Sequence, residues 1–417
     1  MSRPFVLRSA RLIDPASGLD EIGDVRVEDG RIAAIGERVR DGDAALLECE
    51  GLVLAPALID LCARVSASDQ PRGETVESLA RAGAAGGVGT VAITGDSATW
   101  VETPDRITSL LARGGQTGVR VLVAGAMTNG RALAEMGLMA RAGASFLQGA
   151  ETGFSLRRQA LAYAGGLDLL CAVRPDEPGF EDALFWEGEL AARLGVASAP
   201  EAAERLAAER DLALAELTGA RLMLDRVATR EALEPLARAK AKGLEVFGSV
   251  GVAHLSFNEI DAGGLNPAFR MTPPLAGEAS RRALVQAVAD GLIDAIVSDH
   301  CPRAPEEKDA PFGEAAPGSA NIEMLLPALL ALVADGQLTL LQALAPVTSG
   351  PALILGLEQG RLAEGAPADL VLFDTEAPLV CRPETLRGQA RNTAYAGRRL
   401  HGAVRMTLVN GAAAFRG

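Results

Sequence analysis

The stretch Gly51-Leu-Val-Leu-Ala-Pro-Ala-Leu-Ile-Asp-Leu61 is a short apolar run, and similar runs recur along the chain with amphipathic stretches between them. Short apolar runs are typical of strands that are buried on both faces of a parallel sheet. We expect eight such strands, at residues 52–61, 90–93, 120–123, 145–147, 168–172, 220–224, 244–247 and 295–297. The Ala-, Glu- and Arg-rich stretches predict helices at residues 75–85, 104–113, 129–142, 155–164, 200–218, 230–242 and 280–290.

This alternation predicts an α/β protein built on a (β/α)8 TIM barrel. Eight strands with crossover helices over about 250 residues match that fold, in which functional groups lie on the loops after the strands. A doubly wound sheet is the alternative, but no G-x-G-x-x-G follows the first strand. A Pro- and Gly-rich loop at 301–318 follows the eighth strand. Loops longer than about 12 residues usually have a function.

Both ends of the chain have a different sequence pattern, in which short strands of alternating apolar and polar residues are joined by tight turns. Asp29-Gly30 and Asn410-Gly411 are strong hairpin signals between apolar segments. We therefore expect residues 1–51 and 362–417 to form one small β-sandwich module together, and residues 52–361 to form the barrel.

The composition excludes several classes of function. With 40 Lys and Arg against 54 Asp and Glu, the net charge is −14, which disfavours binding to nucleic acid or to an anionic membrane. No apolar run reaches the roughly 18 residues of a membrane span. Five cysteines without a C-x-x-C pair predict a soluble protein of the reducing cytoplasm. Because there are only 3 histidines, at 254, 300 and 401, a histidine-rich metal site is nearly excluded.

Four segments together resemble the dihydroorotase branch of the cyclic amidohydrolases, within the amidohydrolase superfamily. Residues 51–61 resemble its first barrel strand, and Met271-Thr-Pro-Pro-Leu275 is similar to its N-P-P-L run. Ala295-Ile-Val-Ser-Asp-His-Cys-Pro-Arg-Ala-Pro-Glu-Glu-Lys308 resembles its T-D-H-A-P-H-x-x-E-E-K segment. Residues 360–374 resemble the return to the strand module. Because these segments occur in the family's order over nearly the whole chain, the resemblance implies the family's fold.

The resemblance also implies a metal-dependent enzyme, yet the ligand positions do not match. Active members use one or two divalent metals, held by H-x-H on strand one, a His on each of strands five and six, and an Asp on strand eight. The H-x-H position here reads Cys62-Ala63-Arg64, and the single His positions fall on Ala172 and Arg226. Only Asp299 remains. We expect no metal, and Asp299 would be catalytic, with zinc as cofactor, only in an active protein.

Further departures affect the residues that would surround a substrate. The Arg two residues beyond H-x-H is Ser66, and the P-N-T motif reads Gly95-Asp96-Ser97. The second strand-eight His is Arg303, and Leu147–Ala150 on strand four has neither the family's Asp nor its carboxylated Lys. We expect the pocket to be formed by Asp60, Ser66, Asp96, His254, His300 and Arg303.

Arginine at a ligand position opposes a metal, because guanidinium has five N–H donors and no acceptor. We expect Arg64 and Arg226 to replace the cations as partners of Asp60 and Asp299, and at least one of them to donate to Asp299. Two interpretations are less favoured. One is a proton shuttle at Asp299-His300, and the other is a thiolate metal site formed by Cys62, Cys171 and Cys301.

Four arginines, Arg64, Arg174, Arg226 and Arg303, belong to segments at the upper face of the barrel. They could form a pocket for an anion. We favour ion pairs instead, because acidic residues are equally available in the same segments, at positions 60, 96, 176 and 299.

These features favour a dihydroorotase homologue that has lost its chemistry. The resemblance implies that such a protein acts as a structural partner of aspartate carbamoyltransferase in pyrimidine synthesis, in an oligomeric assembly. Two alternatives stay open. The protein could be a metal-dependent cyclic amidohydrolase with atypical ligands, or it could bind an anionic metabolite through the arginine cluster.

Overall fold

The computed structural model describes residues 4–66, 73–96, 99–149 and 153–417; Ser97 and Ala150 of the quoted motifs lie outside them. Its centre is an eight-stranded parallel sheet in sequential order. The strands are β6 (Leu58–Ala63), β7 (Val88–Ile93), β8 (Arg120–Ala126), β11 (Phe146–Gly149), β12 (Cys171–Val173), β15 (Leu222–Leu224), β16 (Val246–Gly251) and β17 (Ala295–Val297). A parallel bridge between Ala63 and His300 connects the two edges. The predicted barrel is therefore confirmed.

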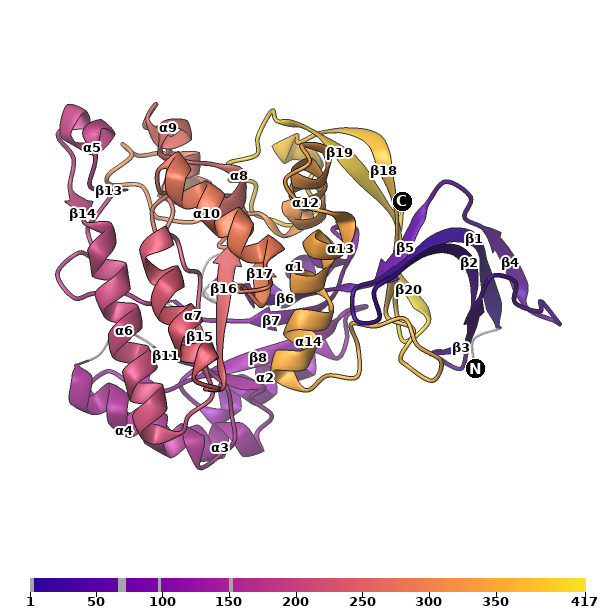
Figure 1. The fold of residues 1–417 in the computed structure, drawn as a ribbon, viewed down its shortest axis with the longest axis horizontal. Helices are drawn as coiled ribbons and strands as arrows, with labels where there is room; N and C mark the ends of the chain where they lie inside the picture. The colour runs from indigo at the N-terminus through magenta and orange to yellow at the C-terminus, as the bar shows by residue number, and fades with distance from the viewer. Residues whose placement is uncertain (1–3, 67–72, 97–98, 150–152) are drawn as a thin grey trace.

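Helices surround this sheet (Figure 1). The first, α1, begins after Thr75, whose side chain accepts from the Ser78 backbone N–H in a capping box. Apolar side chains on the inner faces of the helices form one continuous core with the outer face of the sheet. The longer helices are α1 (Val76–Ala85), α2 (Pro104–Gly114), α4 (Phe154–Gly165), α6 (Glu201–Thr218), α7 (Leu233–Ala241), α10 (Glu278–Ala289), α12 (Leu325–Ala334) and α14 (Ser349–Leu355).

The helix expected at 129–142 is wrong in its first half. A two-stranded hairpin of β9 (Thr128–Asn129) and β10 (Ala132–Leu133) precedes a short α3 (Met136–Arg141). Gly130 between these strands has a φ of +58°, a left-handed conformation that does not continue a helix. The remaining short elements are β13 (Phe185–Trp186), β14 (Ser198–Ala199), α5 (Glu189–Leu194), α8 (Val252–Ser256), α9 (Glu259–Ala262), α11 (Pro305–Lys308), α13 (Leu340–Leu344) and the 3-10 turns Arg230–Ala232, Pro267–Phe269, Ile322–Met324, Ala345–Val347 and Pro383–Thr385.

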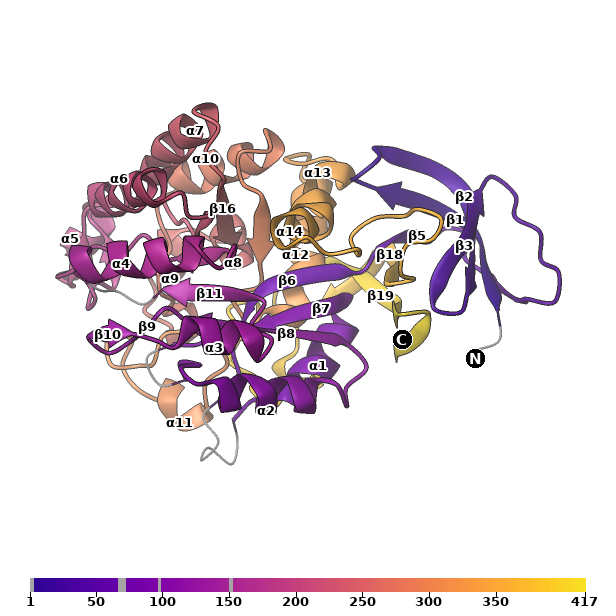
Figure 2. The same ribbon diagram turned by 90° about the horizontal axis from the view of Figure 1, so that it is seen from below.

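The two ends of the chain form one hydrogen-bonded sheet beside the barrel (Figures 1 and 2). Its order is β20-β19-β18-β5-β1-β2-β3, and β4 pairs with β1. The predicted module from both termini is thus present, with an apolar core of its own. Its strands are β1 (Phe5–Asp14), β2 (Leu19–Glu28), β3 (Arg31–Gly36), β4 (Ala45–Glu48), β5 (Val53–Pro56), β18 (Leu370–Val380), β19 (Arg399–Val409) and β20 (Ala412–Arg416).

The stretch 52–61, expected to be one barrel strand, is divided between the module and the barrel. β5 pairs with β18 in the module, and β6 pairs with β7 in the barrel. Pro56 has no N–H and cannot donate to a continuing ladder. The next N–H groups change partner: Ala57 donates to Asp369 O at 2.9 Å, and Leu58 donates to Gly87 O at 2.9 Å. One stretch therefore anchors the barrel to the module.

The loop 301–318 folds back on the end of the barrel at the carboxyl ends of the strands. The Lys308 ammonium donates to the carbonyls of Pro267 and Ala316 at 2.7 and 2.8 Å, and burial lowers its pKa to about 8. Arg303 Nε donates to Pro317 O at 2.8 Å. These bonds hold the loop in one conformation. Among the described residues, no helix combines the length and the apolar character needed to cross a membrane.

Candidate functional site

A cavity of about 380 Å³ lies at the carboxyl ends of the barrel strands, where this fold places its functional groups. Residues from the ends of β7, β11, β12 and β15 form its sides, and the segment after β17 with the loop 301–318 completes it. The four arginines singled out from the sequence, Arg64, Arg174, Arg226 and Arg303, all line this cavity. Asp96 and Asp299 line it as well.

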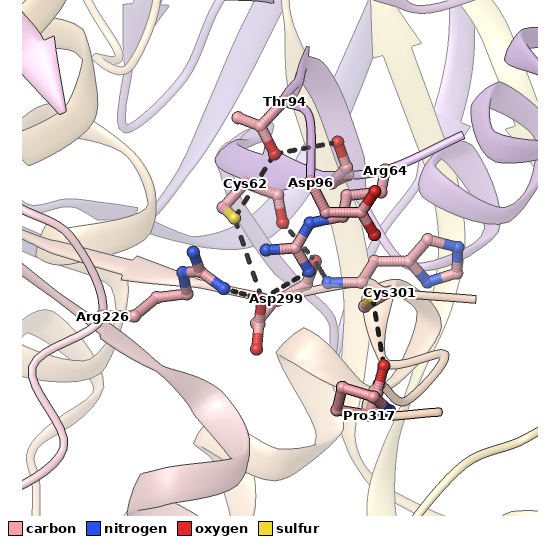
Figure 3. A network of polar contacts seen from close by, with 12 residues as sticks. Cys62, Arg64, Thr94, Asp96, Arg226, Asp299, Cys301 and Pro317 are labelled. Atoms are coloured by element: carbon pink, nitrogen blue, oxygen red, sulfur yellow. Dashed lines mark hydrogen bonds and ion pairs between the residues drawn. The ribbon is translucent and has the colours of Figure 1, made fainter. Parts of the chain in front are cut away.

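Asp299 lies between two guanidinium groups (Figure 3). Arg64 Nη1 donates to Asp299 Oδ1 at 3.1 Å, and Arg226 Nη1 donates to the same oxygen at 2.8 Å. The side chains of Arg64, Arg226 and Asp299 are 8%, 3% and 9% exposed. The expected ion pair with Asp299 is therefore present, and both arginines take part in it.

The charges around Asp299 determine its ionisation. Burial acts to raise the pKa of the carboxyl group, but the positive charges of Arg226 and Arg64 outweigh burial and hold the pKa below its usual value. Asp225 supplies a second carboxylate, which accepts from Arg226 Nε at 2.9 Å and from Ser249 Oγ at 3.0 Å. Asp225 was not singled out from the sequence, although it directly precedes Arg226.

Two members of this cluster have unusual backbone conformations. The φ of Arg226 is +57° and that of Asp299 is +45°, in the left-handed region that non-glycine residues rarely adopt. Each residue follows a barrel strand, and the Arg226 N–H donates to Ser249 Oγ at 2.8 Å. Such conformations cost about 1–3 kcal/mol each and persist where the surroundings fix them. The turns thus aim both side chains toward one point.

Asp60 is not a partner of either arginine, contrary to the expectation from the sequence. Its side chain is fully buried on β6 and accepts from the backbone N–H groups of Ser298 and Cys62 at 3.0 and 3.2 Å. The Ser298 hydroxyl also donates to it. Burial raises the pKa of Asp60 to about 6, because these neutral donors only partly compensate it.

The other two arginines of the cavity form the expected ion pairs at its rim. Arg303 Nη2 donates to Asp96 Oδ2 at 3.0 Å, and Arg174 Nε donates to Asp176. The Arg303 and Arg174 side chains are 19% and 30% exposed, more than those of Arg64 and Arg226. The cavity therefore combines four arginines with nearby aspartates in matched pairs.

Four of the six expected pocket residues do not line the cavity. Asp60 lies beneath it, and Ser66 Oγ accepts from the Glu74 N–H at 2.8 Å in a neighbouring turn. His300 is 2% exposed, with its Nε2 3.7 Å from Glu74 Oε2. His254 Nε2 lies 3.1 Å from Pro273 O, and burial lowers the pKa of this imidazole. Both histidines thus occupy packed positions behind the cavity wall.

The three cysteines near the strand ends do not converge. Cys62 Sγ lies 3.6 Å from Thr94 Oγ1 and 3.8 Å from Asp299 Oδ1, and burial raises the pKa of this thiol to about 12. Cys171 packs in the core outside the sheet, whereas the adjacent Ala172 packs inside the barrel. Cys301 Sγ is 3.7 Å from Pro317 O.

The donor set at this position does not fit a divalent metal. In the part of the chain that the structure describes, no group of three His, Cys, Asp or Glu side chains is placed to hold a metal ion. At the positions that the resemblance assigns to ligands, Arg64 and Arg226 present N–H donors with fixed positive charge, and Ala172 presents a methyl group. Asp299 is the single carboxylate among them.

Two cavity residues, Gln148 and Trp100, were not expected from the sequence. Gln148 at the end of β11 accepts from the Gly95 N–H at 2.9 Å and donates to Gly95 O at 3.3 Å, which fixes the turn before Asp96. Trp100 supplies the aromatic surface of the cavity. No local pattern marks either residue, because one comes from the end of β11 and the other from the loop between β7 and α2.

Comparisons with solved structures support the fold. The structure matches an L-hydantoinase (dihydropyrimidinase) from Arthrobacter aurescens with a TM-score of 0.90 and 22% sequence identity, over 99% of this chain and 96% of that one. A dihydropyrimidinase from Brevibacillus agri matches with a TM-score of 0.84 and 21% identity, over 99% and 95% of the two chains.

Sequence comparisons identify the family. The chain is 36% identical over 422 residues to a dihydroorotase from Anaeromyxobacter dehalogenans, covering 99% of this chain and 98% of that protein. It is also 36% identical over 414 residues to a dihydroorotase-like protein from Pseudomonas aeruginosa, covering 97% and 98%. The model of the Amidohydrolase family matches residues 197–414. With a barrel of this kind and full-length relatives named dihydroorotase and dihydroorotase-like protein, the chain belongs to the amidohydrolase family.

Proposed function

We propose that this protein is a dihydroorotase-like protein of pyrimidine metabolism that has lost the metal site. In this proposal it acts as a non-catalytic structural partner of aspartate carbamoyltransferase. The family and the full-length relatives support the metabolic assignment. The loss of chemistry and the partner go beyond them and rest on the composition of the site.

The observation that carries the proposal is the position of two guanidinium groups on Asp299. Arg64 and Arg226 donate to one carboxylate oxygen at 3.1 and 2.8 Å, where the family would place a cation. A metal at this point would meet two fixed positive charges, and the only carboxylate at the ligand positions is already neutralised. Without a Lewis acid, neither a nucleophilic hydroxide nor stabilisation of a tetrahedral oxyanion is available at neutral pH.

Metal content and turnover test the loss of chemistry. We expect the purified protein to contain less than stoichiometric zinc after dialysis, and we expect no hydrolysis of dihydroorotate and no cyclisation of carbamoyl-aspartate. Asp299→Ala should leave this baseline unchanged. One equivalent of metal that resists dialysis, together with turnover that Asp299→Ala abolishes, would instead support a cyclic amidohydrolase with atypical ligands.

Association with aspartate carbamoyltransferase tests the role. A stable interface needs about 800 Å² from each partner, a small part of the 16670 Å² surface of this protein. We expect light scattering of the mixed proteins to give a complex, and we expect carbamoyltransferase activity to fall when this protein is deleted from its cells. Separate peaks at micromolar concentration, with carbamoyltransferase activity indifferent to this protein, would contradict the partner assignment.

A further inference from the structure

The guanidinium pair at Asp299 is only partly used by the protein itself. Arg64 makes a single side-chain hydrogen bond among the described residues, to Asp299, and its buried Nε has no partner. Arg226 uses Nε and Nη1, and within the same part of the chain its Nη2 makes no hydrogen bond. Both side chains are more than nine-tenths buried and both line the cavity. Because both side chains line the cavity, their Nη2 groups, which make no hydrogen bond to the described residues, are the donors that an additional acceptor there can reach.

The geometry of the pair favours a carboxylate as that acceptor. Because both Nη1 atoms donate to one oxygen of Asp299, the two guanidinium groups converge from the segments that follow β6 and β15. Planar guanidinium groups bind planar carboxylates through paired N–H donors. A carboxylate that enters the cavity can therefore accept from the Nη2 groups, which neither Asp299 nor Asp225 uses.

The charge around the cavity favours a ligand with one negative charge over a ligand with two. Arg64 and Arg226 are balanced by Asp225 and Asp299, and the arginines at the rim are balanced by Asp96 and Asp176. A doubly charged phosphate would be repelled by these aspartates more strongly than a monocarboxylate would. The volume of about 380 Å³ is typical of sites for small organic ligands, and Trp100 offers an apolar surface for the ligand body.

We propose that Arg64 and Arg226 form a binding site for a small organic monocarboxylate at the position where the family holds its metal. This inference rests on the part of the proposed function that excludes a metal from the site, and it is independent of the protein partner. The carboxylate would bind without reacting, because it is held by donors on its oxygens and no nucleophile is supplied.

Calorimetric titration of the full-length protein tests the site, with benzoate as probe and benzamide as its uncharged counterpart. We expect saturable binding of benzoate and none of benzamide or inorganic phosphate. Removing one charged hydrogen bond should weaken benzoate binding about tenfold in Arg64→Gln. Arg64→Lys retains the charge but not the planar group, so its affinity for benzoate should lie between those of the wild type and Arg64→Gln. Arg238→Gln changes a 58%-exposed arginine on α7 and should bind as the wild type does.

The outcomes separate this inference from the proposed function. Elemental analysis of the same preparation is the second measurement, and stoichiometric metal would contradict the proposed function itself. Metal-free protein that binds neither compound, or that binds benzoate and benzamide equally, would overturn the carboxylate site alone. Equal binding of benzoate by wild type and Arg64→Gln would overturn the assignment to this pair. The comparison of the two probes on the wild type needs no variant, so misfolding of a variant does not affect it.

Discussion

Asp60 on β6 and Asp299 just after β17 are two buried aspartates of one barrel, and they are held in opposite ways. Asp299 receives two guanidinium groups, and its pKa lies below the usual value despite burial. Asp60, one layer deeper, receives only neutral donors, and burial raises its pKa to about 6. Arg64 and Arg226 therefore determine the ionisation of Asp299, whereas burial and neutral donors determine that of Asp60.

This difference bears on the proposed loss of the metal site. A dication influences several groups at once, whereas a guanidinium group neutralises the acceptor that its N–H groups touch. The two arginines thus stabilise the Asp299 carboxylate, whereas Asp60 depends on Ser298 and on the Cys62 N–H. Four changes probe this contrast, from the largest expected effect to the smallest.

Removing the Asp299 carboxylate should cause the largest loss of stability. Asp299→Ala leaves Arg64 without its acceptor and Arg226 with Asp225 alone, both in a buried layer. Breaking buried ion pairs in this way costs about 3–5 kcal/mol. Urea unfolding of the variant measures this loss. The control is Asp176→Ala, at a 28%-exposed side chain, where we expect below about 1 kcal/mol; equal losses in the two variants would contradict the charged layer.

The Asp60 carboxyl group should give a pH dependence that Asp60→Asn removes. Its pKa rises from 3.8 to about 6 on folding, so the folded state holds the proton between these values. The contribution is fully present below the lower value and is lost as the pH rises through the higher one. The wild type should therefore lose up to about 3 kcal/mol of its unfolding free energy relative to Asp60→Asn across this interval.

Unfolding free energies measured from about pH 4 to pH 7 test this prediction, because the interval covers the titration of an ordinary and a raised carboxyl group. Asparagine retains an acceptor for the backbone N–H groups, and its amide can donate to Ser298 Oγ. Parallel curves for the two proteins would show that Asp60 titrates alike in both states, and the contrast with Asp299 would then disappear.

The two arginines should differ from each other. Arg226 bonds to Asp225 and Asp299, whereas Arg64 bonds to Asp299 alone. Replacement by Met removes the charge and retains the length of the side chain. We expect Arg226→Met to lose about 1–2 kcal/mol more than Arg64→Met, because it leaves one further buried acceptor less satisfied. A comparison of urea midpoints measures the difference; the reverse order would indicate that Asp225 is satisfied by Ser249.

The fold followed from the sequence because the barrel signal is local and repeated. Each buried strand is an apolar run, and the carboxyl end of each can be read from the helix that follows. The stretch 52–61 was harder, because its composition is apolar throughout, and the exchange of partners at Pro56 depends on where β18 and β7 lie. The helix expected from residue 129 was wrong because Gly130 and its hairpin interrupt an otherwise helical composition.

The site was partly predictable for a different reason. Family positions identified Arg64, Arg226 and Asp299 as neighbours, and opposite charge predicted their pairing. The residue type does not reveal how deep a side chain lies in the barrel. Asp299 faces the cavity and Asp60 faces Ser298, but the sequence does not distinguish them. The sequence does not identify Asp225 as part of the site, because its contact with Arg226 depends on the left-handed turn at that residue.

Cys62 lies between the layer of Asp60 and that of Asp299, and we expect the smallest effect here, in the reactivity of its thiol. Its N–H donates to Asp60 Oδ1 at 3.2 Å, and its Sγ lies 3.8 Å from Asp299 Oδ1. Burial raises the pKa of the thiol from 9.0 to about 12, because a thiolate here would be desolvated, and the nearby arginines only partly offset this. At a mildly alkaline pH this leaves about a thousandfold less thiolate than in an ordinary cysteine, and the thiolate is the reactive form. Iodoacetamide should therefore leave Cys62 unmodified in the native protein and modify it fully in urea, as peptide mapping by mass spectrometry can measure.

Cys301, at the cavity wall, is the internal comparison and should react first with iodoacetamide. Native modification of Cys62 as fast as of Cys301 would mean that the layer between the two aspartates is open to solvent, and their opposite pKa shifts would then lose their physical basis.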